Sequence, residues 1–316
     1  MMKKTASPDA NSIAACTSRR QALSFMLGSL PFWSAAEAAG AVDPVVRVAI
    51  SQTLVAEVNL NDARAAMLVW TEQIAKEMGI RLHNDPGVFE TTEQILHKLR
   101  TDQVDTVALN CIEYRAAASL LDSSEIIIST NRSRSQYVVL VKKDAGFRAL
   151  SDLRGRTLVQ LDDPQMCLAP AWLSTILFEE HLEQPEQFFS ARERQTKPTR
   201  VVLPVFFGQA DACITSLGSF NTMCELNPQV SKKLAVLVGS PALVASFHVF
   251  RKGFQGPLRE RFKKALLGIS SSPTGEQLMM LFQFDQLIVQ SGNSLNESLR
   301  ILEASERARS ESGRTE

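Results

Sequence analysis

The sequence predicts an α/β protein of two lobes, each a mainly parallel sheet flanked by helices, with a cleft between the lobes. Short apolar runs alternate with amphipathic patterns of about 10 to 15 residues, which is typical of βαβ units. This alternation runs once through the first part of the chain and restarts at residue 135. A strand pattern near residue 244 then leads back to the first unit. Two successive units of this kind favour two lobes over one long sheet.

Residues 39–134 are predicted to form lobe 1. Short runs rich in β-branched residues predict its strands, at residues 44–51, 80–84 and 104–110. Apolar residues at helical spacing predict its helices, at residues 63–79 and 91–103. Gly79 is a usual signal for the end of the first helix, and Thr92 is the expected N-cap of the second.

Polar side chains follow the first and third of these strands. In open α/β sheets, ligands lie beyond the carboxyl ends of the strands. We therefore expect Ser51, Gln52 and Thr53, after the first strand, to face the cleft, with simple turn chemistry as the alternative. Asn110 and Tyr114 follow the third strand in the same way. A cleft-facing Tyr114 would stack on a ligand or hydrogen-bond to it, and packing in the core is the alternative.

Residues 135–243 are predicted to form lobe 2. Its strands are expected at residues 135–144, 153–161, 187–191, 210–216 and 232–240. Its helices are expected at residues 168–182, 198–208 and 218–228. Pro198 stands at the favoured first turn of its helix, and Pro204 inside the same helix should kink it.

Residues 244–316 are predicted to return to lobe 1 and to end in helices. A strand is expected at residues 244–253. Amphipathic patterns predict helices at residues 255–269, 273–282 and 294–310. The last pattern ends in a charged tail that we expect to fray.

The first 38 residues are predicted to be an export signal outside the fold. Arg19 and Arg20 precede a short apolar run at residues 22–33, and a small-x-small site follows, with cleavage expected near Ala38. The Ser-Arg-Arg-x-x-Leu spacing from residue 18 resembles the twin-arginine type. A general secretory signal or a retained anchor is the alternative.

Composition limits the partners and cofactors of this chain. With 34 basic and 34 acidic residues, it has no electrostatic footprint for nucleic acid or an anionic membrane. No pair of its 4 histidines has metal-ligand spacing, so we predict neither a metal nor a cofactor. The cysteines after the export segment are Cys111, Cys167, Cys213 and Cys224. The last two are close enough in sequence for a disulfide, and free buried thiols are the equal alternative.

Three stretches resemble the phosphonate-binding-protein-like branch of the ABC transporter solute-binding proteins. They are VDTVALNCIEY at residues 104–114, SQYVVLVKKDAGFRALSDLRGRTLVQLDDP at 135–164 and FFGQADACITS at 206–216. In that family a strand leads through a turn like DLRGK into a second strand that ends in Asp-Pro. A Gly-x-x-Asp-Ala turn opens a later strand. The resemblance covers roughly residues 45–252, and its most specific part is residues 137–164.

The resemblance implies a type II periplasmic binding protein fold, a periplasmic location and a cleft for a phosphonate, phosphite or related oxyanion. Helix N-termini and hydroxyl groups would hold that anion. The chain departs from the family after the Asp-Pro pair, where the family places a cluster of Ser, Thr or Gly. Here the residues are Gln165, Met166 and Cys167, which carry no hydroxyl group. We therefore expect a ligand less anionic than a phosphonate, or one held mainly by backbone donors and Arg200.

The family plan also places other residues of lobe 2 at the cleft. Gln165 and Cys167 precede a helix and face the cleft on this plan, with a solvated Gln165 and a packed Cys167 as the equal alternative. Met166 is expected to line a wall, and Asp163 is expected to cap the following turn and not to hold a metal. Tyr137 begins the crossover strand, where the plan puts the hinge.

Two further pairs are candidate ligand residues. Thr199 and Arg200 open the helix that starts at Pro198, and Thr215 and Ser216 close a strand. Arg200 would supply the cationic half of an oxyanion clamp. A solvated arginine is the alternative.

We predict a solute-binding protein that closes two lobes over a small ligand, with phosphonates and other oxyanions among the candidates, and presents it to an ABC importer. A monomer is expected. The alternative is a periplasmic sensor that docks on a membrane histidine kinase. An enzyme with Cys111 or Cys167 as its nucleophile is less favoured, because no histidine lies near either residue in sequence to lower the thiol pKa.

Overall fold

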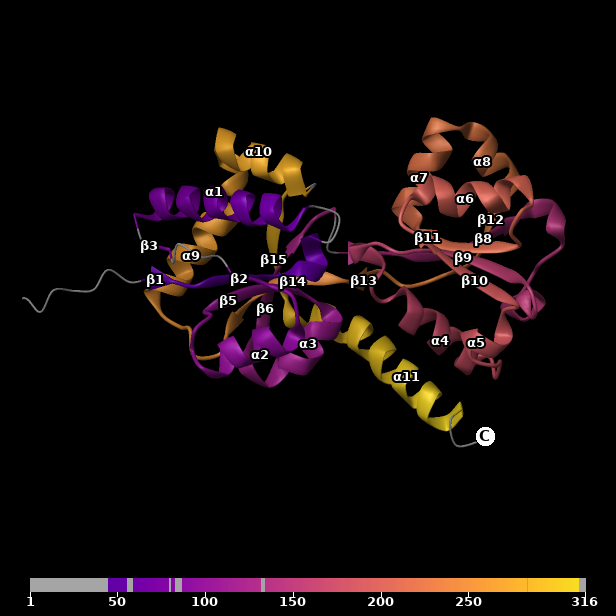
Figure 1. Cartoon of the computed structure of the whole chain (residues 1–316), viewed down its shortest axis with the longest axis horizontal. Helices are drawn as coiled ribbons and strands as arrows, with labels where there is room; N and C mark the ends of the chain where they lie inside the picture. The colour runs from indigo at the N-terminus through magenta and orange to yellow at the C-terminus, as the bar shows by residue number, and fades with distance from the viewer. Residues whose placement is uncertain are drawn as a thin grey trace, which may run out of the picture. The chain divides into compact units, whose positions relative to one another are not determined.

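The computed structural model of the chain describes residues 45–55, 59–79, 81–82, 87–131, 134–282 and 284–312. The predicted export segment and the end of the charged tail lie outside the described residues. Val42–Glu316 is one compact unit, and it contains two main sheets (Figure 1). Within the described part of the chain, no helix combines the length and the apolarity that a membrane span requires.

The first sheet has six strands and is mixed. In spatial order its strands are β15 (Leu287–Ser291), β6 (Leu121–Ser129), β14 (Ser246–Arg251), β5 (Thr106–Asn110), β2 (Val48–Ser51) and β4 (Gly87–Phe89). β2 pairs in parallel with β4 and β5, whereas β14 pairs antiparallel with β5 and β6, and β15 pairs antiparallel with β6.

Helices cover both faces of this sheet (Figure 1). On one face are α1 (Leu60–Met78), α9 (Pro257–Leu267) and α10 (Pro273–Phe282), and on the other are α2 (Thr92–Arg100) and α3 (Cys111–Ala117). The sheet and these five helices are called lobe 1 below.

The second sheet has five strands and is also mixed. In spatial order its strands are β10 (Ala191–Gln195), β9 (Thr157–Leu161), β11 (Ala212–Ser216), β8 (Tyr137–Lys142) and β12 (Leu234–Gly239). β9 pairs in parallel with β10 and β11, and β8 pairs antiparallel with β11 and β12. β8 is an interior strand, and because both of its faces are covered, its side chains from Tyr137 to Val141 are all buried.

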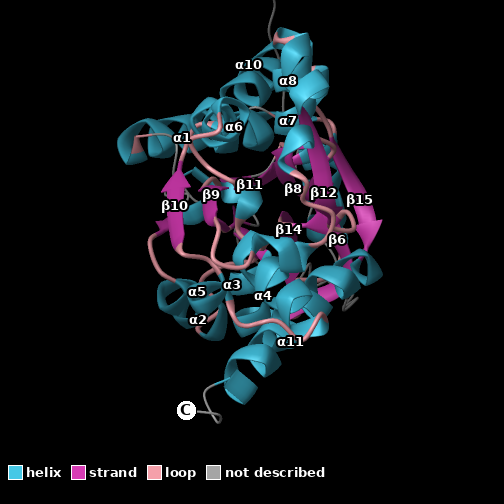
Figure 2. Ribbon diagram, turned by 90° about the vertical axis from the view of Figure 1, so that its right-hand side faces the viewer, coloured by secondary structure: helices cyan, strands magenta, loops and turns pink. Residues whose placement is uncertain are grey.

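Helices flank this sheet as well (Figure 2). On one face are α4 (Ala169–Glu179) and α5 (Pro185–Phe188), and on the other are α6 (Pro198–Phe207), α7 (Leu217–Leu226) and α8 (Pro228–Lys233). The sheet and these helices are called lobe 2. Two-residue strands form two small ribbons elsewhere: β1 (Val45–Val46) with β3 (Arg81–Leu82), and β7 (Arg134–Ser135) with β13 (Leu243–Val244).

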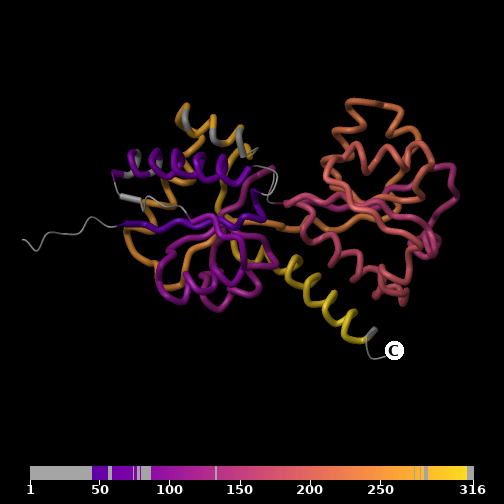
Figure 3. Tube along the Cα trace, viewed as in Figure 1, coloured from indigo at the N-terminus to yellow at the C-terminus, as the bar shows by residue number. Residues whose placement is uncertain are grey.

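The chain passes from lobe 1 to lobe 2 through β7 and returns through β13, and these two strands pair antiparallel (Figure 3). The last helix, α11 (Asn296–Ser312), packs on α4 and also contacts α3. Thr175 of α4 donates a hydrogen bond from Oγ1 to the carbonyl of Ile301 at 3.2 Å, and the N–H of Val244 donates to Ser298 Oγ at 2.9 Å. α11 is therefore bonded both to lobe 2 and to a crossover strand.

The two-lobed α/β prediction is confirmed, with local differences. Each sheet is mixed and not mainly parallel, because β8 and β14, the first strands after each crossing between the lobes, pair antiparallel with their neighbours. The sequence did not predict β6 or β15. Where a strand was expected at residues 187–191, α5 extends to Phe188 and the strand β10 begins only at Ala191.

Helix α2 shows how local sequence sets an element boundary. Thr91, and not Thr92 as expected, is the N-cap: the N–H of Gln94 donates to Thr91 Oγ1 at 3.3 Å, and the Gln94 side chain accepts from the N–H of Thr91. This reciprocal pair satisfies two donors that the first turn of a helix leaves free. Ile95 and Leu99, four residues apart, are buried against lobe 1.

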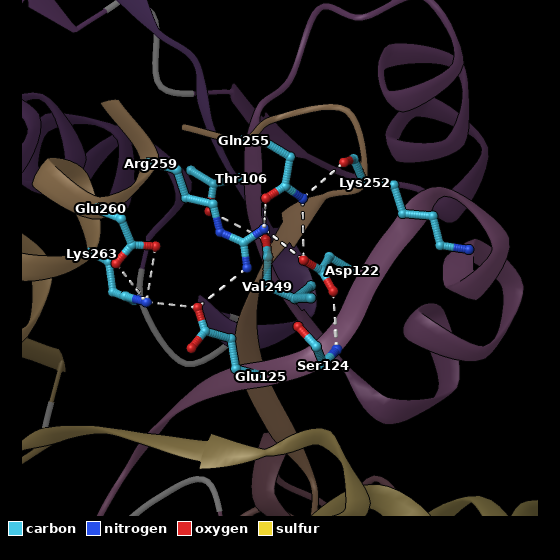
Figure 4. Close-up of polar contacts among 10 residues, drawn as sticks. All are labelled: Thr106, Asp122, Ser124, Glu125, Val249, Lys252, Gln255, Arg259, Glu260 and Lys263. Atoms are coloured by element: carbon cyan, nitrogen blue, oxygen red, sulfur yellow. Dashed lines mark hydrogen bonds and ion pairs between the residues drawn. The ribbon is translucent and has the colours of Figure 1, made fainter. Parts of the chain in front are cut away.

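A group of ion pairs around the buried Arg259 holds α9 against β6 (Figure 4). Arg259 of α9 donates from Nη1 to Asp122 Oδ2 at 2.6 Å and from Nη2 to Glu125 Oε1 at 3.2 Å. Its guanidinium carbon lies 4.6 Å from the centre of the Phe250 ring. Lys263, one turn further along α9, binds Glu125 at 2.8 Å. Helix and strand are thus joined by two ion pairs of Arg259 and one of Lys263 above an apolar core, although Arg259 Nε has no partner within the described residues.

Candidate functional site

A hydrogen-bonded group of polar side chains lies at the carboxyl ends of β2 and β5. Ser51 Oγ donates to Glu113 Oε1 at 2.5 Å, and Thr53 Oγ1 lies 3.3 Å from both oxygens of that carboxylate. Asn110 Nδ2 donates to Thr53 Oγ1 at 3.0 Å. Ser51, Asn110 and Glu113 are buried, whereas Thr53 is exposed. These four residues, called the polar cluster below, therefore reach solvent through Thr53.

The first turn of α3 builds the polar cluster. Asn110 is the N-cap of this helix: its Oδ1 accepts from the N–H of Glu113 at 2.9 Å, and Glu113 Oε2 accepts from the N–H of Asn110 at 2.9 Å. Both ends of the Asn110 amide are thus occupied within the protein. The cluster contains one carboxylate, and no cation among the described residues is bonded to it. Its charge opposes an anion and favours a neutral or cationic group.

The loop after β9, residues 162–167, is called the cradle loop and contains the short helix η5 (Pro164–Met166). Asp163 Oδ1 accepts hydrogen bonds from the backbone N–H groups of Gln165 at 2.8 Å and Met166 at 3.1 Å. The prediction that Asp163 caps this turn is confirmed. Two backbone donors that would face an oxyanion are therefore already bonded to a carboxylate of the same loop.

Tyr137 holds the cradle loop by a hydrogen bond. Its hydroxyl donates to the carbonyl of Gln165 at 2.8 Å, and its side chain is fully buried. Burial raises the pKa of Tyr137 well above its usual value, so the hydroxyl remains a donor at neutral pH. Met166 is buried in the core, so it does not line a cleft wall as expected. Gln165 stays half-buried, on the loop that contacts η1 (Gln52–Val55) of lobe 1.

Cys111 and Cys167 approach the same backbone carbonyl. The N–H of Cys111 donates to the carbonyl of Ala245 at 2.8 Å, and Cys167 Sγ donates to the same oxygen at 3.6 Å. Burial raises the pKa of both thiols to about 12. Each thiol is therefore protonated at neutral pH and is a poor nucleophile. Cys213 and Cys224 are free thiols as well, so the free-thiol alternative holds for them and the disulfide does not.

Four other predicted residues are not bonded to the polar cluster. Thr199 and Arg200 are exposed at the start of α6, and the Arg200 side chain has no ion pair or hydrogen bond within the described residues. Thr215 and Ser216 are buried at the end of β11. Ser216 caps α7 by accepting from the N–H of Ser219 at 3.0 Å. Thr215 Oγ1 is buried and finds no partner in the part of the chain described.

Tyr114 lies in the core of lobe 1 and not at an open surface. Its side chain is 4% exposed, and its ring packs edge-on against Phe247, with 5.0 Å between ring centres. This placement corresponds to the packing alternative. Gln52 is half-buried in η1, next to the polar cluster.

The structure thus brings three of the predicted residues, Ser51, Thr53 and Asn110, into one cluster. The sequence reasoning missed Glu113, which joins them. The signal was present, because Asn-x-x-Glu directly after a strand is a capping-box pattern. Across residues 45–312, apart from the segments left undescribed, no group of three or more His, Cys, Asp or Glu side chains is arranged to hold a metal ion.

The two-lobed architecture identifies the fold, which solved type II periplasmic binding proteins share. XAC2383 from Xanthomonas citri, solved with chloride, is 15% identical, with 84% of this chain and 99% of that chain covered and a TM-score of 0.59. PhnD1 from Prochlorococcus marinus MIT 9301, solved with methylphosphonate, is 14% identical, with coverages of 81% and 96% and a TM-score of 0.54. A binding protein component of an ABC phosphonate transporter from Pseudomonas aeruginosa is 12% identical, with coverages of 84% and 88% and a TM-score of 0.52.

The sequence places the chain within this class. The family model described as ABC transporter, phosphonate, periplasmic substrate-binding protein matches residues 54–294. The chain belongs to that family, as its sequence motifs suggested. No curated protein sequence matches the chain.

Proposed function

We propose that this protein captures a small ligand between its lobes and presents the closed form to a membrane ABC permease. The observation that carries the proposal is the polar cluster at the carboxyl ends of β2 and β5, where open α/β sheets bind their ligands. η1, which follows Ser51, contacts η5 of the cradle loop in lobe 2. Membership of a periplasmic substrate-binding family supports the solute-binding role and the permease partner.

The ligand residues in this proposal lie on both lobes. Ser51, Gln52, Thr53 and Asn110 contribute from lobe 1, and Gln165 contributes from lobe 2. Closure follows from a ligand that binds the closed arrangement more tightly than the open one. The crossover strands β7 and β13 are the proposed hinge. The mechanism requires no covalent chemistry, and the raised pKa values of Cys111 and Cys167 support its absence.

The charge of the site supports a ligand less anionic than a phosphonate. Glu113 places a carboxylate in the polar cluster, and Asp163 occupies the backbone donors of the cradle loop. Neither feature favours an oxyanion. The alternative is an oxyanion clamped by Arg200, whose guanidinium is exposed and can bind two oxygens at once.

The remaining parts of the proposal concern the mature protein. We propose export to the periplasm, removal of the first 38 residues by cleavage near Ala38, and a monomeric binding protein. Genes for a permease and an ATPase beside this gene would support import, whereas a histidine kinase gene would support the sensor alternative.

A thermal-shift panel tests the capture of a ligand. The compounds are amines, small neutral heterocycles, phosphonates, phosphite, phosphate and sulfonates. A ligand at 100 times its dissociation constant adds about 2.7 kcal/mol to the free energy of unfolding. We expect an amine or a neutral compound to raise the melting temperature, and Thr53→Val to weaken this effect. Thr222→Val, an exposed threonine on α7, is the matched control and should not change it.

Two results would contradict this ligand class. Strong stabilisation by a phosphonate, lost in Arg200→Ala but kept in Arg148→Ala, would establish the oxyanion alternative. Arg148 is a suitable control because it is also an exposed arginine of lobe 2. Stabilisation by no compound of the panel would contradict capture of any of these classes.

A further inference from the structure

Lobe 1 contains a cavity of about 160 Å³ between its sheet and α1. The walls include Ala49 and Ile50 of β2, Ala108 of β5, and Met67 and Trp70 of α1. No charged side chain of the described residues lines it. An apolar cavity of about 150 Å³ holds one benzene molecule, so this space suits about six carbon atoms. It is called the lobe 1 cavity below.

Trp70, in the cavity wall, has a hydrogen-bond donor without a partner. The Trp70 side chain lines the cavity and is 9% exposed, and its Nε1–H makes no hydrogen bond within the described residues. A buried donor left unpaired destabilises a fold, and such a group calls for an explanation such as a missing ligand or water. A ligand atom that accepts from this indole N–H would remove the penalty.

His248 gives the cavity an uncharged polar wall. It lines the cavity and is buried, and burial lowers its pKa to about 3, so the imidazole is neutral. Its Nε2 bonds to Thr106 Oγ1, which also lies 3.2 Å from the carbonyl of Val249. Because a hydroxyl has one proton, both contacts hold together only if Thr106 donates to Val249 and His248 Nε2 donates to Thr106. Nδ1 of His248 is then an acceptor.

The lobe 1 cavity adjoins the polar cluster. Ile50, in its wall, directly precedes Ser51. Ser246, also in its wall, is the sheet partner of Asn110. Gln165 of the cradle loop lines the cavity from lobe 2. A molecule in the cavity therefore contacts the cradle loop at Gln165, and two residues of the cavity wall are direct neighbours of polar-cluster residues, along β2 and across β14.

We propose that the lobe 1 cavity holds the uncharged, mainly apolar part of the captured ligand. That part is a ring or short chain of about six carbon atoms with one hydrogen-bond acceptor, such as a hydroxyl or carbonyl oxygen, directed at Trp70 Nε1. The polar end of the ligand lies at the polar cluster. This inference rests on the proposed capture function and specifies its ligand class.

Phenol and benzene are the probes that test the cavity. Both are of the size that the cavity holds, and only phenol has an acceptor for Trp70 and a donor for His248. The readout is the indole ¹H–¹⁵N signal of Trp70 in the ¹⁵N-labelled protein, assigned with Trp70→Phe. The signal of Trp172, which is buried in lobe 2, is the internal control. We expect phenol to move the Trp70 proton downfield, to leave the Trp172 signal in place, and to bind at least fivefold more tightly than benzene.

Two variants separate the cavity from general effects. Ala108→Leu fills the cavity and should weaken phenol binding at least tenfold, whereas Ala145→Leu, at an exposed alanine of lobe 2, should not. Trp70→Phe keeps an aromatic wall but removes the donor, so the preference for phenol over benzene should become smaller than in the wild type. Because Trp70→Phe also enlarges the cavity, some loss of stability is expected, and an unchanged Trp172 signal separates this folded variant from one that merely unfolds.

The stabilising compound from the thermal-shift panel decides whether the cavity belongs to ligand capture. Displacement of phenol by that compound, with a shift of the Trp70 signal, supports the inference. If the compound raises the melting temperature but neither displaces phenol nor moves the Trp70 signal, capture stands and the cavity assignment is overturned. If phenol itself leaves the Trp70 signal unchanged, the assignment is overturned whatever the panel gives.

Discussion

Replacing Arg259 by methionine should lower the stability of lobe 1 by about 3 kcal/mol. The side chain is 5% exposed and binds Asp122 and Glu125, which are 20% and 25% exposed. Removing one member of a fully buried pair costs about 3–5 kcal/mol. The lower end applies here, because water reaches both carboxylates and Glu125 keeps Lys263 at 2.8 Å. Methionine retains the contact with Phe250 but not the attraction of a cation for that ring.

The effect should depend on pH in one direction. Burial opposes ionisation of Asp122, but hydrogen bonds from Arg259, Ser124 and Gln255 outweigh it and lower its pKa well below the usual range. A carboxyl with a lowered pKa stabilises the fold above the pKa of the unfolded chain, and this contribution is lost as the pH falls toward the folded value. The difference between the wild type and Arg259→Met should therefore be constant from about pH 7 to 5 and shrink below about pH 4.

Urea unfolding at pH 7 and at pH 3.5 measures this difference. Lys264→Met is the matched control, because Lys264 is exposed on the same helix and forms no ion pair within the described residues. It should change the free energy of unfolding by less than about 0.5 kcal/mol. The reasoning would be refuted if Arg259→Met were as stable as this control, or if its deficit were the same at both pH values.

Three further predictions concern buried polar groups. The Thr215 hydroxyl is buried without a described partner, so Thr215→Val should leave the free energy of unfolding unchanged or raise it by up to about 1 kcal/mol. A lower free energy of unfolding in urea would show that the hydroxyl has a partner. Burial raises the pKa of the Cys111 and Cys167 thiols to about 12. Both should therefore react slowly with a thiol reagent at pH 7.5 in the native protein and fast in urea. Rapid labelling of Cys167 in the native protein would contradict this prediction. Burial lowers the pKa of His248 to about 3, so on acidification the unfolded chain is protonated at this residue before the folded protein is. The free energy of unfolding should therefore fall as the pH drops from about 6.5 toward 3. His248→Phe should flatten this dependence, and an unchanged slope would contradict the role of His248.

Strong local signals made much of the fold predictable from the sequence. The continuous apolar run of β8, the capping signals of α1 and α6, and the restart at residue 135 are local features, and each was recognised. β6 was missed because its first half, after Leu121, reads Asp-Ser-Ser-Glu. Its extended form depends on pairing with β14 and β15, whose partners are more than a hundred residues away. The strand propensity of the local sequence does not reveal pairing with strands so far along the chain.

The sequence predicted those site residues whose positions depend only on the order of the strands. Ser51, Thr53 and Asn110 follow strands that lie side by side in parallel, so their meeting follows from topology. The role of Trp70 was not predictable, because a tryptophan on the apolar face of a helix normally packs in the core. Only the three-dimensional structure shows that its N–H has no described partner and that its side chain lines a cavity.

The last helix of the chain would let residues far from the ligand set the affinity of the proposed binding protein. α11 is bonded to Thr175 of lobe 2, to Val244 of a crossover strand and, through Glu306, to Arg115 of lobe 1. Any change in the angle between the lobes must stretch or exchange at least one of these contacts. In the proposed mechanism, substitutions on α11 therefore shift the balance between open and closed forms, and with it the apparent dissociation constant, while every ligand contact stays the same. The apparent affinity of such a binding protein can thus evolve, for scarce or abundant solute, through changes in a helix that does not contact the solute.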